Sequence, residues 1–151
     1  MLRRAILAAA LLAAVLGPTR LAAQTHRDVI IRQLDAAVAI KKPDGFRPDG
    51  DVLPRDIVVG VLPAGGAVAF ELLLTGGSTY FITGVCDGDC SDLDLRVIDP
   101  DDGETVSEDI EDDDVPMLEF VAPRTGPFLL SVMMPDCSED LCYFGYRVMR
   151  K

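Results

Sequence analysis

From residue 56 onward, the chain consists of short runs in which apolar and polar residues alternate, and this pattern constrains the fold more than any other feature. The clearest run is 92–98, where Leu93, Leu95 and Val97 alternate with charged residues. A period of two places successive side chains on opposite faces of a β-strand, with one face buried. Segments rich in glycine and proline separate the runs, as turns do.

These runs predict about eight strands and no unit in which helices alternate with strands. Their spacing of roughly 9–14 residues is typical of an antiparallel β-sandwich of the jelly-roll type. The sequence therefore predicts an all-β fold. The expected strands are 56–62, 67–74, 78–86, 92–98, 104–109, 115–121, 128–134 and 143–149.

The N-terminus has the pattern of a secretory signal. Two arginines precede an unbroken apolar run over 5–16, and the small residues Ala22 and Ala23 follow it. An uncleaved anchor is the alternative, but an apolar run of 12 residues is too short to cross a bilayer of about 30 Å as a helix. We expect cleavage after 1–23, a periplasmic or secreted protein, and no membrane insertion after cleavage.

A helical period follows the signal. Apolar residues between Val29 and Val38 fall on one stripe, Thr25 is a candidate N-cap, and Pro43 ends the pattern. We expect one N-terminal α-helix over about 26–41, which packs on the sandwich. The expected organisation is a signal peptide over 1–23, a helical segment over 24–42, a turn-rich linker over 43–55 and a sandwich domain over 56–151.

The charge of the exported part excludes two classes of partner. Three of the 14 basic residues and none of the 25 acidic ones lie in 1–23, so 11 basic and 25 acidic residues remain, a formal charge of −14. Nucleic-acid binders need a cationic face, and so do proteins that bind anionic membrane surfaces. A cation or a basic partner suits this charge, and plain solubility explains it equally well.

The four cysteines come in two close pairs, Cys86 with Cys90 and Cys137 with Cys142. In an exported chain an even number of cysteines favours disulfides over a zinc site built from four thiolates. Local pairs would each be worth roughly 2 kcal/mol in the chain-entropy model, and a cross-pair roughly 4 kcal/mol. We favour local pairs, and a cross-pair such as Cys86 to Cys137 remains the alternative.

Several segments in order match a known domain pattern. They are the hydrophobic run 80–86, the Asp-Leu-Asp-Leu run 92–95, the turn at Asp99-Pro100, Pro116 with Leu118 and Phe120, Ala122-Pro123, the hairpin at Thr125-Gly126, the strand 128–134, and Cys137, Cys142 and Tyr143. Together they resemble the bacterial pre-peptidase C-terminal domain. The resemblance covers about 56–149. It departs from the pattern at Phe128, where a tyrosine is usual, and only a helix precedes the domain, not a peptidase.

This resemblance implies a non-catalytic jelly-roll sandwich that acts beside secreted enzymes. The collagen-binding domains of clostridial collagenases are similar, and there calcium lies near an Asp-x-Asp strand. Because no peptidase precedes the domain in this chain, assistance to a linked protease cannot be carried over. The protein would act alone or in trans.

A run of acids around Gly88 is the candidate metal site, with Asp87, Asp89, Asp92 and Asp94 as ligands. Calcium takes six to eight oxygen ligands in irregular geometry, and alternate residues of one strand reach the same ion. By resemblance Asp92 and Asp94 are the first choices. The alternative is that these side chains cap turns. Further candidates to complete the shell are Asp101, Asp102, Asp49 and Asp51.

The other acidic run, 108–114, is typical of a solvated loop, and a surface for a cation or a basic partner is its alternative. Catalytic residues are not apparent. The chain has a single histidine, His26, which we expect at an exposed position in the first helical turn, and the serines of the domain have no histidine to activate them. Tryptophan is absent, and few aromatic residues are available to line a sugar cleft.

We therefore predict an exported, non-catalytic binding module with calcium as its candidate ion and no other cofactor. It would contact a protein or peptide partner in the cell envelope or outside it. A metal-free structural or stress-protective envelope protein is the alternative.

Overall fold

The computed structural model describes residues 18–50 and 57–151, with side chains from Thr25 onward. Most of the expected signal peptide, the end of the expected linker and the candidate ligand Asp51 lie outside the described residues. Within the described part, none of the helices combines the length and the apolar character needed to span a bilayer.

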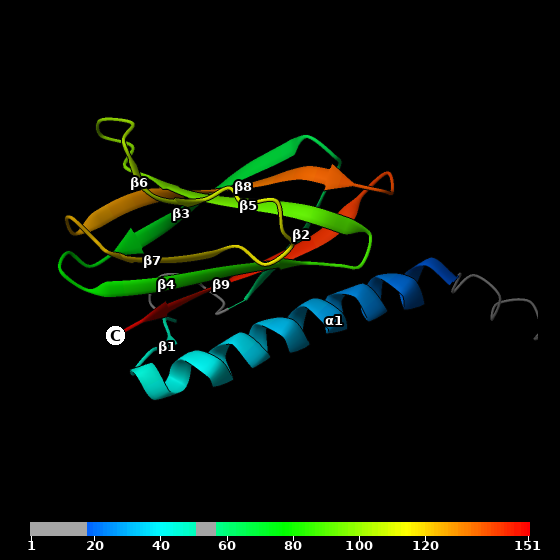
Figure 1. The fold of residues 1–151 in the computed structure, drawn as a ribbon, viewed down its shortest axis with the longest axis horizontal. Helices are drawn as coiled ribbons and strands as arrows, with labels where there is room; N and C mark the ends of the chain where they lie inside the picture. The colour runs from blue at the N-terminus through cyan, green and yellow to red at the C-terminus, as the bar shows by residue number, and fades with distance from the viewer. Residues whose placement is uncertain (1–17, 51–56) are drawn as a thin grey trace, which may run out of the picture.

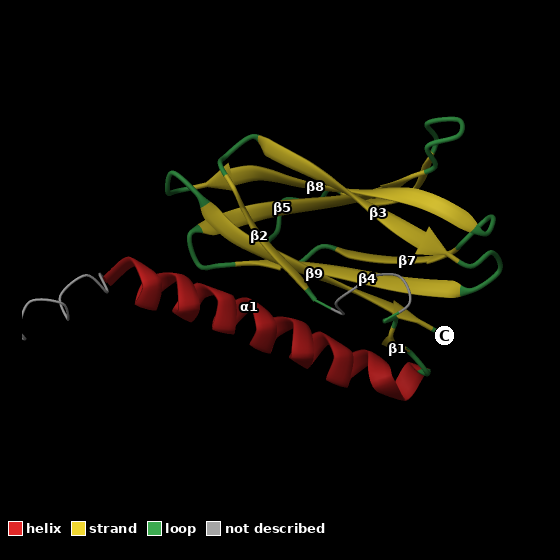
Figure 2. Cartoon of the chain, turned by 180° about the vertical axis from the view of Figure 1, so that it is seen from behind, coloured by secondary structure: helices red, strands yellow, loops and turns green. Residues whose placement is uncertain are grey.

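Two antiparallel sheets face each other, and one helix runs along the outside of the first sheet (Figures 1 and 2). The first sheet contains β1 (Arg47–Pro48), β2 (Val58–Leu62), β4 (Thr79–Cys86), β7 (Met117–Val121) and β9 (Cys142–Arg150). The second contains β3 (Gly66–Leu74), β5 (Cys90–Ile98), β6 (Thr105–Asp109) and β8 (Gly126–Cys137). The predicted all-β sandwich with one N-terminal helix is confirmed.

The strand order is that of a jelly roll. The first sheet runs β1-β9-β4-β7, with β2 also paired to β9, and the second runs β3-β8-β5-β6. From β2 to β9, every connection except β5 to β6 crosses from one sheet to the other. Strand neighbours within a sheet are therefore mostly far apart in sequence, and only the packing of the two sheets brings them together.

The core lies between the sheets and is built from the alternate residues that the sequence pattern marks. On β5, the residues Leu93, Leu95 and Val97 are fully buried, while their polar neighbours lie on the outer face. Apolar residues of β4, β8 and β9 complete the same cluster. Strand β9 differs from β5 because both of its faces are buried.

Helix α1 (Pro18–Lys41) covers the outer face of the first sheet, where it contacts β9 and β4. Ile30 and Leu34 are fully buried against this face. Gly145 of β9 permits the close approach, since a Cβ there would lie 2.3 Å from Ile30 Cγ2. The helix begins before the predicted start, so Thr25 lies inside it and not at its N-cap. Alanine, leucine and glutamine upstream continue the helix, and proline suits its first position.

The segment after the helix is partly integrated into the sandwich, unlike the linker that the sequence predicts over 43–55. Phe46 is fully buried against Phe81 and Met149. Strand β1 then pairs with the end of β9. Proline-rich composition indicated a turn, but one aromatic side chain is enough to anchor this segment through burial of apolar surface.

Each disulfide joins one sheet to the other. Cys86 of β4 is bonded to Cys90 of β5, and Cys137 of β8 is bonded to Cys142 of β9. Cys90 and Cys137 are opposite each other in the β5–β8 pairing, so both disulfides lie at the same end of the sandwich. The predicted local pairing is confirmed.

We expect Gly145→Ala to lower the free energy of unfolding by about 1–3 kcal/mol, the usual cost of inserting a methyl group into a packed interface. The new Cβ would meet Ile30 and, at 3.0 Å, the carbonyl oxygen of Val58. Urea unfolding followed by circular dichroism measures the change. Gly50→Ala is the control, because a Cβ at Gly50 would have no atom within 4 Å. Equal effects of the two changes would contradict this packing.

We also expect replacement of either cysteine pair by serine to cost about 2 kcal/mol, because each disulfide closes a short loop. Urea unfolding of the Cys137→Ser, Cys142→Ser variant under non-reducing conditions measures this. If neither the double substitution nor reduction of the remaining disulfide changes the free energy of unfolding, the expected contribution of the disulfides is wrong.

Candidate functional site

Both disulfides and their loops form one end of the sandwich, which we call the disulfide end (residues 86–90 and 137–142). The backbone carbonyl of Asp89 accepts hydrogen bonds from the N–H and the hydroxyl of Ser138, at 2.8 and 2.9 Å. The two loops are thus tied to each other as well as closed by disulfides. The carboxylates that they carry consequently have defined positions.

His26 reaches this end from α1. Its Nδ1 lies 2.8 Å from Oδ2 of Asp87, and its ring stacks on Tyr143 with 5.0 Å between centroids. The expected exposed position in the first helical turn is therefore wrong. Because α1 begins at Pro18, His26 lies about two turns inside the helix, and its side chain faces the sandwich with 34% of its surface exposed.

Asp87 is a buried carboxylate with an incomplete set of hydrogen bonds. The residue is 3% exposed. Its Oδ2 contacts His26 and also accepts a hydrogen bond from the N–H of Tyr143 at 3.2 Å. Its Oδ1 is buried and has no partner among the described residues. A buried polar atom without a partner costs free energy, so this oxygen has a reason to bind a further group.

His26, Asp87 and Asp89 together have the spacing of metal ligands. One ligand atom from each lies within 4.8 Å of the others, and no other group of three acids, cysteines or histidines in the described part of the chain meets this condition. The group borders an open hollow of about 410 Å³, which Glu139 and Asp140 also line. One imidazole and two carboxylates are donors that zinc and other first-row metals accept.

Asp92 and Asp94 lie elsewhere, on the outer face of β5. Asp136 is opposite Asp92 in the pairing with β8. The loop after β6 approaches β5, since the N–H of Leu93 donates to the carbonyl of Asp113 at 2.9 Å. We call the resulting group the acidic face. Its members are Asp92, Asp94, Asp109, Asp112, Asp113 and Asp136.

The pKa values of two members of the acidic face are raised. Desolvation, followed by the charges of Asp112, Asp136 and Asp113, raises the pKa of Asp92. Desolvation and the charge of Asp92 likewise raise the pKa of Asp94. Oδ1 of Asp92 is also buried with no partner among the described residues. The ionised acidic face therefore destabilises the fold in the absence of a counterion.

The four predicted calcium ligands are thus divided between two places. Asp87 and Asp89 join His26 at the disulfide end, while Asp92 and Asp94 belong to the acidic face. Calcium binding stays a prediction. The contribution of His26 escaped the sequence analysis because 61 residues separate it from Asp87, and no local pattern links a helix to a loop at that distance. The presence of one histidine in a chain that also carries an acidic cluster was the one available signal.

An apolar groove lies between α1 and the edge of the first sheet. Its volume is about 350 Å³, and its lining is almost entirely apolar. Ile40 and Met117 are 74% and 55% exposed at its rim. We call it the α1–β7 groove. It is lined by Gln33, Ala36, Ala37, Ile40 and Lys41 of α1, Phe81, Thr83 and Val85 of β4, and Val115 and Met117.

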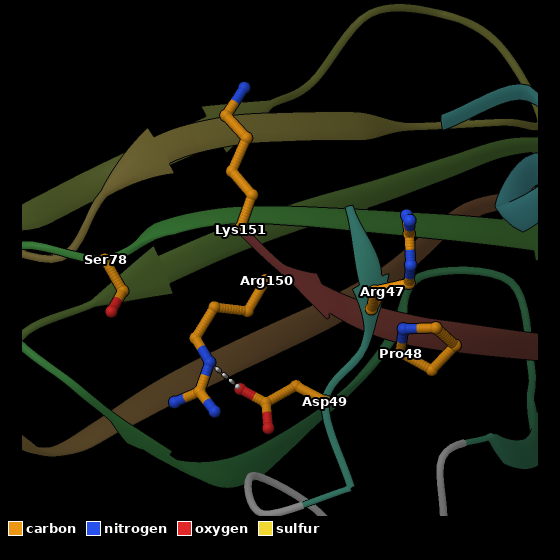
Figure 3. A pocket seen from close by; sticks show the side chains of 6 residues that line it. All are labelled: Arg47, Pro48, Asp49, Ser78, Arg150 and Lys151. Atoms are coloured by element: carbon orange, nitrogen blue, oxygen red, sulfur yellow. Dashed lines mark ion pairs between the residues drawn. The ribbon is translucent and has the colours of Figure 1, made fainter. Parts of the chain in front are cut away.

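A basic corner with a hollow of about 330 Å³ lies where β1 meets the end of β9. Figure 3 shows Arg150 directed toward Asp49, with 3.1 Å between Nε and Oδ2, while Arg47 and Lys151 extend away from this pair. Arg47 donates to two backbone carbonyls, and Lys151 pairs with Glu119. These cations serve internal contacts and do not converge on a ligand.

The described side chains do not form a nucleophile–base pair around the histidine. His26 bonds to Asp87, whereas the hydroxyls of Ser91 and Ser138 bond to Asp136 and to a backbone carbonyl. A histidine activates a serine only within hydrogen-bond reach. The hydroxyls of these two serines are therefore not positioned for activation by His26.

Comparison with known proteins found no matching family model and no similar curated protein. Among solved structures, the chain is similar to Aeromonas hydrophila PliG, a periplasmic lysozyme inhibitor of g-type lysozyme. The TM-score is 0.47 at 17% sequence identity, and the match covers 63% of this chain and 84% of that one. A likeness at this level carries no argument about the function of this protein.

We expect Asp92→Asn to stabilise the metal-free protein at pH 7. A raised pKa in the folded state means that the folded chain binds the proton more tightly than the unfolded one. Stability then falls as pH rises from the ordinary value of 3.8 through the raised value. Thermal melts in EDTA from pH 3 to 7 should show the advantage of the variant at neutral pH and its loss below the ordinary value.

Asp99→Asn is the control, for which we expect the opposite change in stability. The hydrogen bond from Arg124, whose Nε lies 2.8 Å from Oδ2, lowers the pKa of Asp99. The stability that this pair contributes is present at neutral pH and is lost as pH falls below the ordinary range. Asp99→Asn should therefore destabilise the protein at pH 7. A lower melting temperature for Asp92→Asn at that pH would contradict the repulsion on the acidic face.

Proposed function

We propose that the chain is an exported, non-catalytic binding module that holds an extended segment of a protein partner against the α1–β7 groove. The observation that carries this proposal is the groove itself, an almost wholly apolar hollow at the edge of a sheet. Exposed apolar patches on acidic exported proteins are unfavourable in water, and they commonly mark contact sites.

The edge strand β7 suits an added strand. Among the described strands, β7 pairs with β4 alone. Met117 and Val121 are 55% and 57% exposed along it. An extended peptide that pairs with such an edge gains main-chain hydrogen bonds, and pockets beside the edge select its alternate side chains. The α1–β7 groove is the pocket that would receive an apolar side chain.

The charge beside the groove is compensated. Glu119 lies between the two exposed apolar residues of β7 and pairs with Lys41 at 3.3 Å and Lys151 at 3.2 Å. Hydrogen bonds from these lysines lower its pKa. Because the two lysines compensate the charge of Glu119, this carboxylate adds no uncompensated charge to the face beside the groove. Such a face favours an apolar ligand over a strongly charged one.

The cysteines and the sequence pattern support a location outside the cytoplasm. Two disulfides suit an oxidising compartment. The resemblance to the pre-peptidase C-terminal domain supports a role beside secreted enzymes. The partner would accordingly be a protein of the periplasm or the extracellular medium, and a secreted peptidase assisted in trans is one such partner.

We also propose that calcium binds at the acidic face. Two observations favour a cation there. The Oδ1 atom of Asp92 has no partner among the described residues, and the pKa values of Asp92 and Asp94 are raised. The loop that carries Asp112 and Asp113 already bonds to β5 through Leu93 and would supply further carboxylates to the ligand set. Millimolar calcium should then raise the melting temperature by mass action, and Asp92→Asn, Asp94→Asn should abolish that shift. An unchanged melting temperature in the wild-type protein would remove calcium from the function.

Site-specific photocrosslinking in cells tests the binding face. A benzophenone residue at Ile40, at the rim of the groove, should form an adduct with one defined envelope protein. The same probe at Leu73, which is 56% exposed on the other sheet, is the matched control. Met117→Glu should remove the adduct at Ile40, because a buried charge without a partner is costly.

Equal adducts at both positions, or adducts at Ile40 that survive Met117→Glu, would contradict a binding face at the groove. An adduct with a second copy of this chain would assign the face to self-association. A clean absence of adducts would favour the metal-free structural role instead.

A further inference from the structure

We propose that His26, Asp87 and Asp89 bind a first-row transition metal, with zinc as the reference ion, and that this ion links α1 to the disulfide end. This site is separate from the acidic face and from the α1–β7 groove. It does not depend on the proposed binding function.

The donor set favours a transition metal over calcium. Calcium sites are built from oxygen ligands, whereas imidazole nitrogen is a preferred ligand of zinc, copper and nickel. The group offers one imidazole and two carboxylates within 4.8 Å of one another. Three protein ligands with a remaining position open toward a hollow are the arrangement of accessible zinc sites.

The buried carboxylate provides a second, independent observation. Asp87 is 97% buried, borders the hollow, and carries an Oδ1 that has no partner among the described residues. A turn aspartate that only caps backbone groups belongs at the surface, where water satisfies its remaining lone pairs. An ion would instead supply the missing partner and compensate the buried charge.

The supports of the site are rigid without the ion. The two loops are closed by disulfides and tied together by the bonds from Ser138 to the carbonyl of Asp89. The imidazole is held flat against Tyr143, at an interplanar angle of 14°. Ligands held in place by their neighbours lose little entropy on binding, which favours affinity.

The test uses the exported chain without a polyhistidine tag. Because His26 is the only histidine, the imidazole signals in a ¹H–¹⁵N spectrum report on this site alone. Addition of ZnCl₂ should shift both ring nitrogens and saturate at one ion per chain. Calorimetry should give the same stoichiometry.

Three variants locate the ligands. His26→Gln and Asp89→Asn should each weaken zinc binding by at least about 10–100-fold, the cost of losing a residue that only supports a ligand, because each of these residues would be a ligand itself. Asp87→Asn should do the same, and its circular dichroism and melting temperature without zinc verify that it folds. Asp92→Asn, Asp94→Asn is the matched control and should leave zinc binding unchanged.

Several outcomes would overturn the proposal. Zinc binding without any shift of the imidazole signals would place the ion elsewhere. Binding that survives both Asp87→Asn and Asp89→Asn would mean that the two aspartates are not ligands and would overturn this group as the site. Absence of zinc binding at micromolar concentration would remove the site, whatever calcium or the groove were found to bind.

Discussion

The burial of β9 on both faces is the constraint on which the rest of the structure depends. Its inner face contributes Phe144, Tyr146 and Val148 to the core between the sheets. Its outer face seats the helix, with Gly145 beneath Ile30. Three strands pair with it, since β1 and β2 occupy one side and β4 the other. Without this strand, the helix would lose its contact surface, the first sheet would lose its central pairing, and the core would lose three buried side chains.

The disulfide end shows how the topology creates a site. In a jelly roll most connections pass between sheets, so the loops that join β4 to β5 and β8 to β9 cross the same end of the sandwich. Each loop is closed by a disulfide. Asp87 and Tyr143 therefore lie beside each other, and the helix seated on β9 brings His26 to them. The arrangement at this end thus follows from the packing of the helix as much as from the cysteines.

Two regions of the surface differ in how their carboxylates are compensated. Carboxylates concentrate on the acidic face, where desolvation and the charges of neighbouring carboxylates raise the pKa of Asp92 and Asp94. Beside the α1–β7 groove, by contrast, the charge of Glu119 is compensated by two lysines. Net charge alone, which the sequence shows as strongly negative, does not distinguish these regions. Calcium binding and protein binding are therefore proposed for different faces of the domain.

Local patterns in the sequence were sufficient for the strands β2 to β9 and for the body of the helix, but not for β1, which lies in the segment predicted as a linker. Alternation such as that of 92–98 is a property of neighbouring residues, and it decides which face of a strand is buried before any partner strand is known. The start of the helix was misplaced, because Thr25 has the pattern of an N-cap but lies inside the helix. Phe46 was missed as an anchor, because composition describes a segment as a whole and not the contact that a single side chain makes.

The sequence by itself determined an acidic β-sandwich with one helix, and it predicted export and two local disulfides. Only the tertiary structure decided that the candidate calcium ligands are divided, that His26 faces Asp87 across 61 residues of chain, and that a groove remains between α1 and β7. The physical reason is that periodicity encodes which side of an element is apolar. Which distant elements then meet, and what surface is left uncovered, depends on the packing of all of them together.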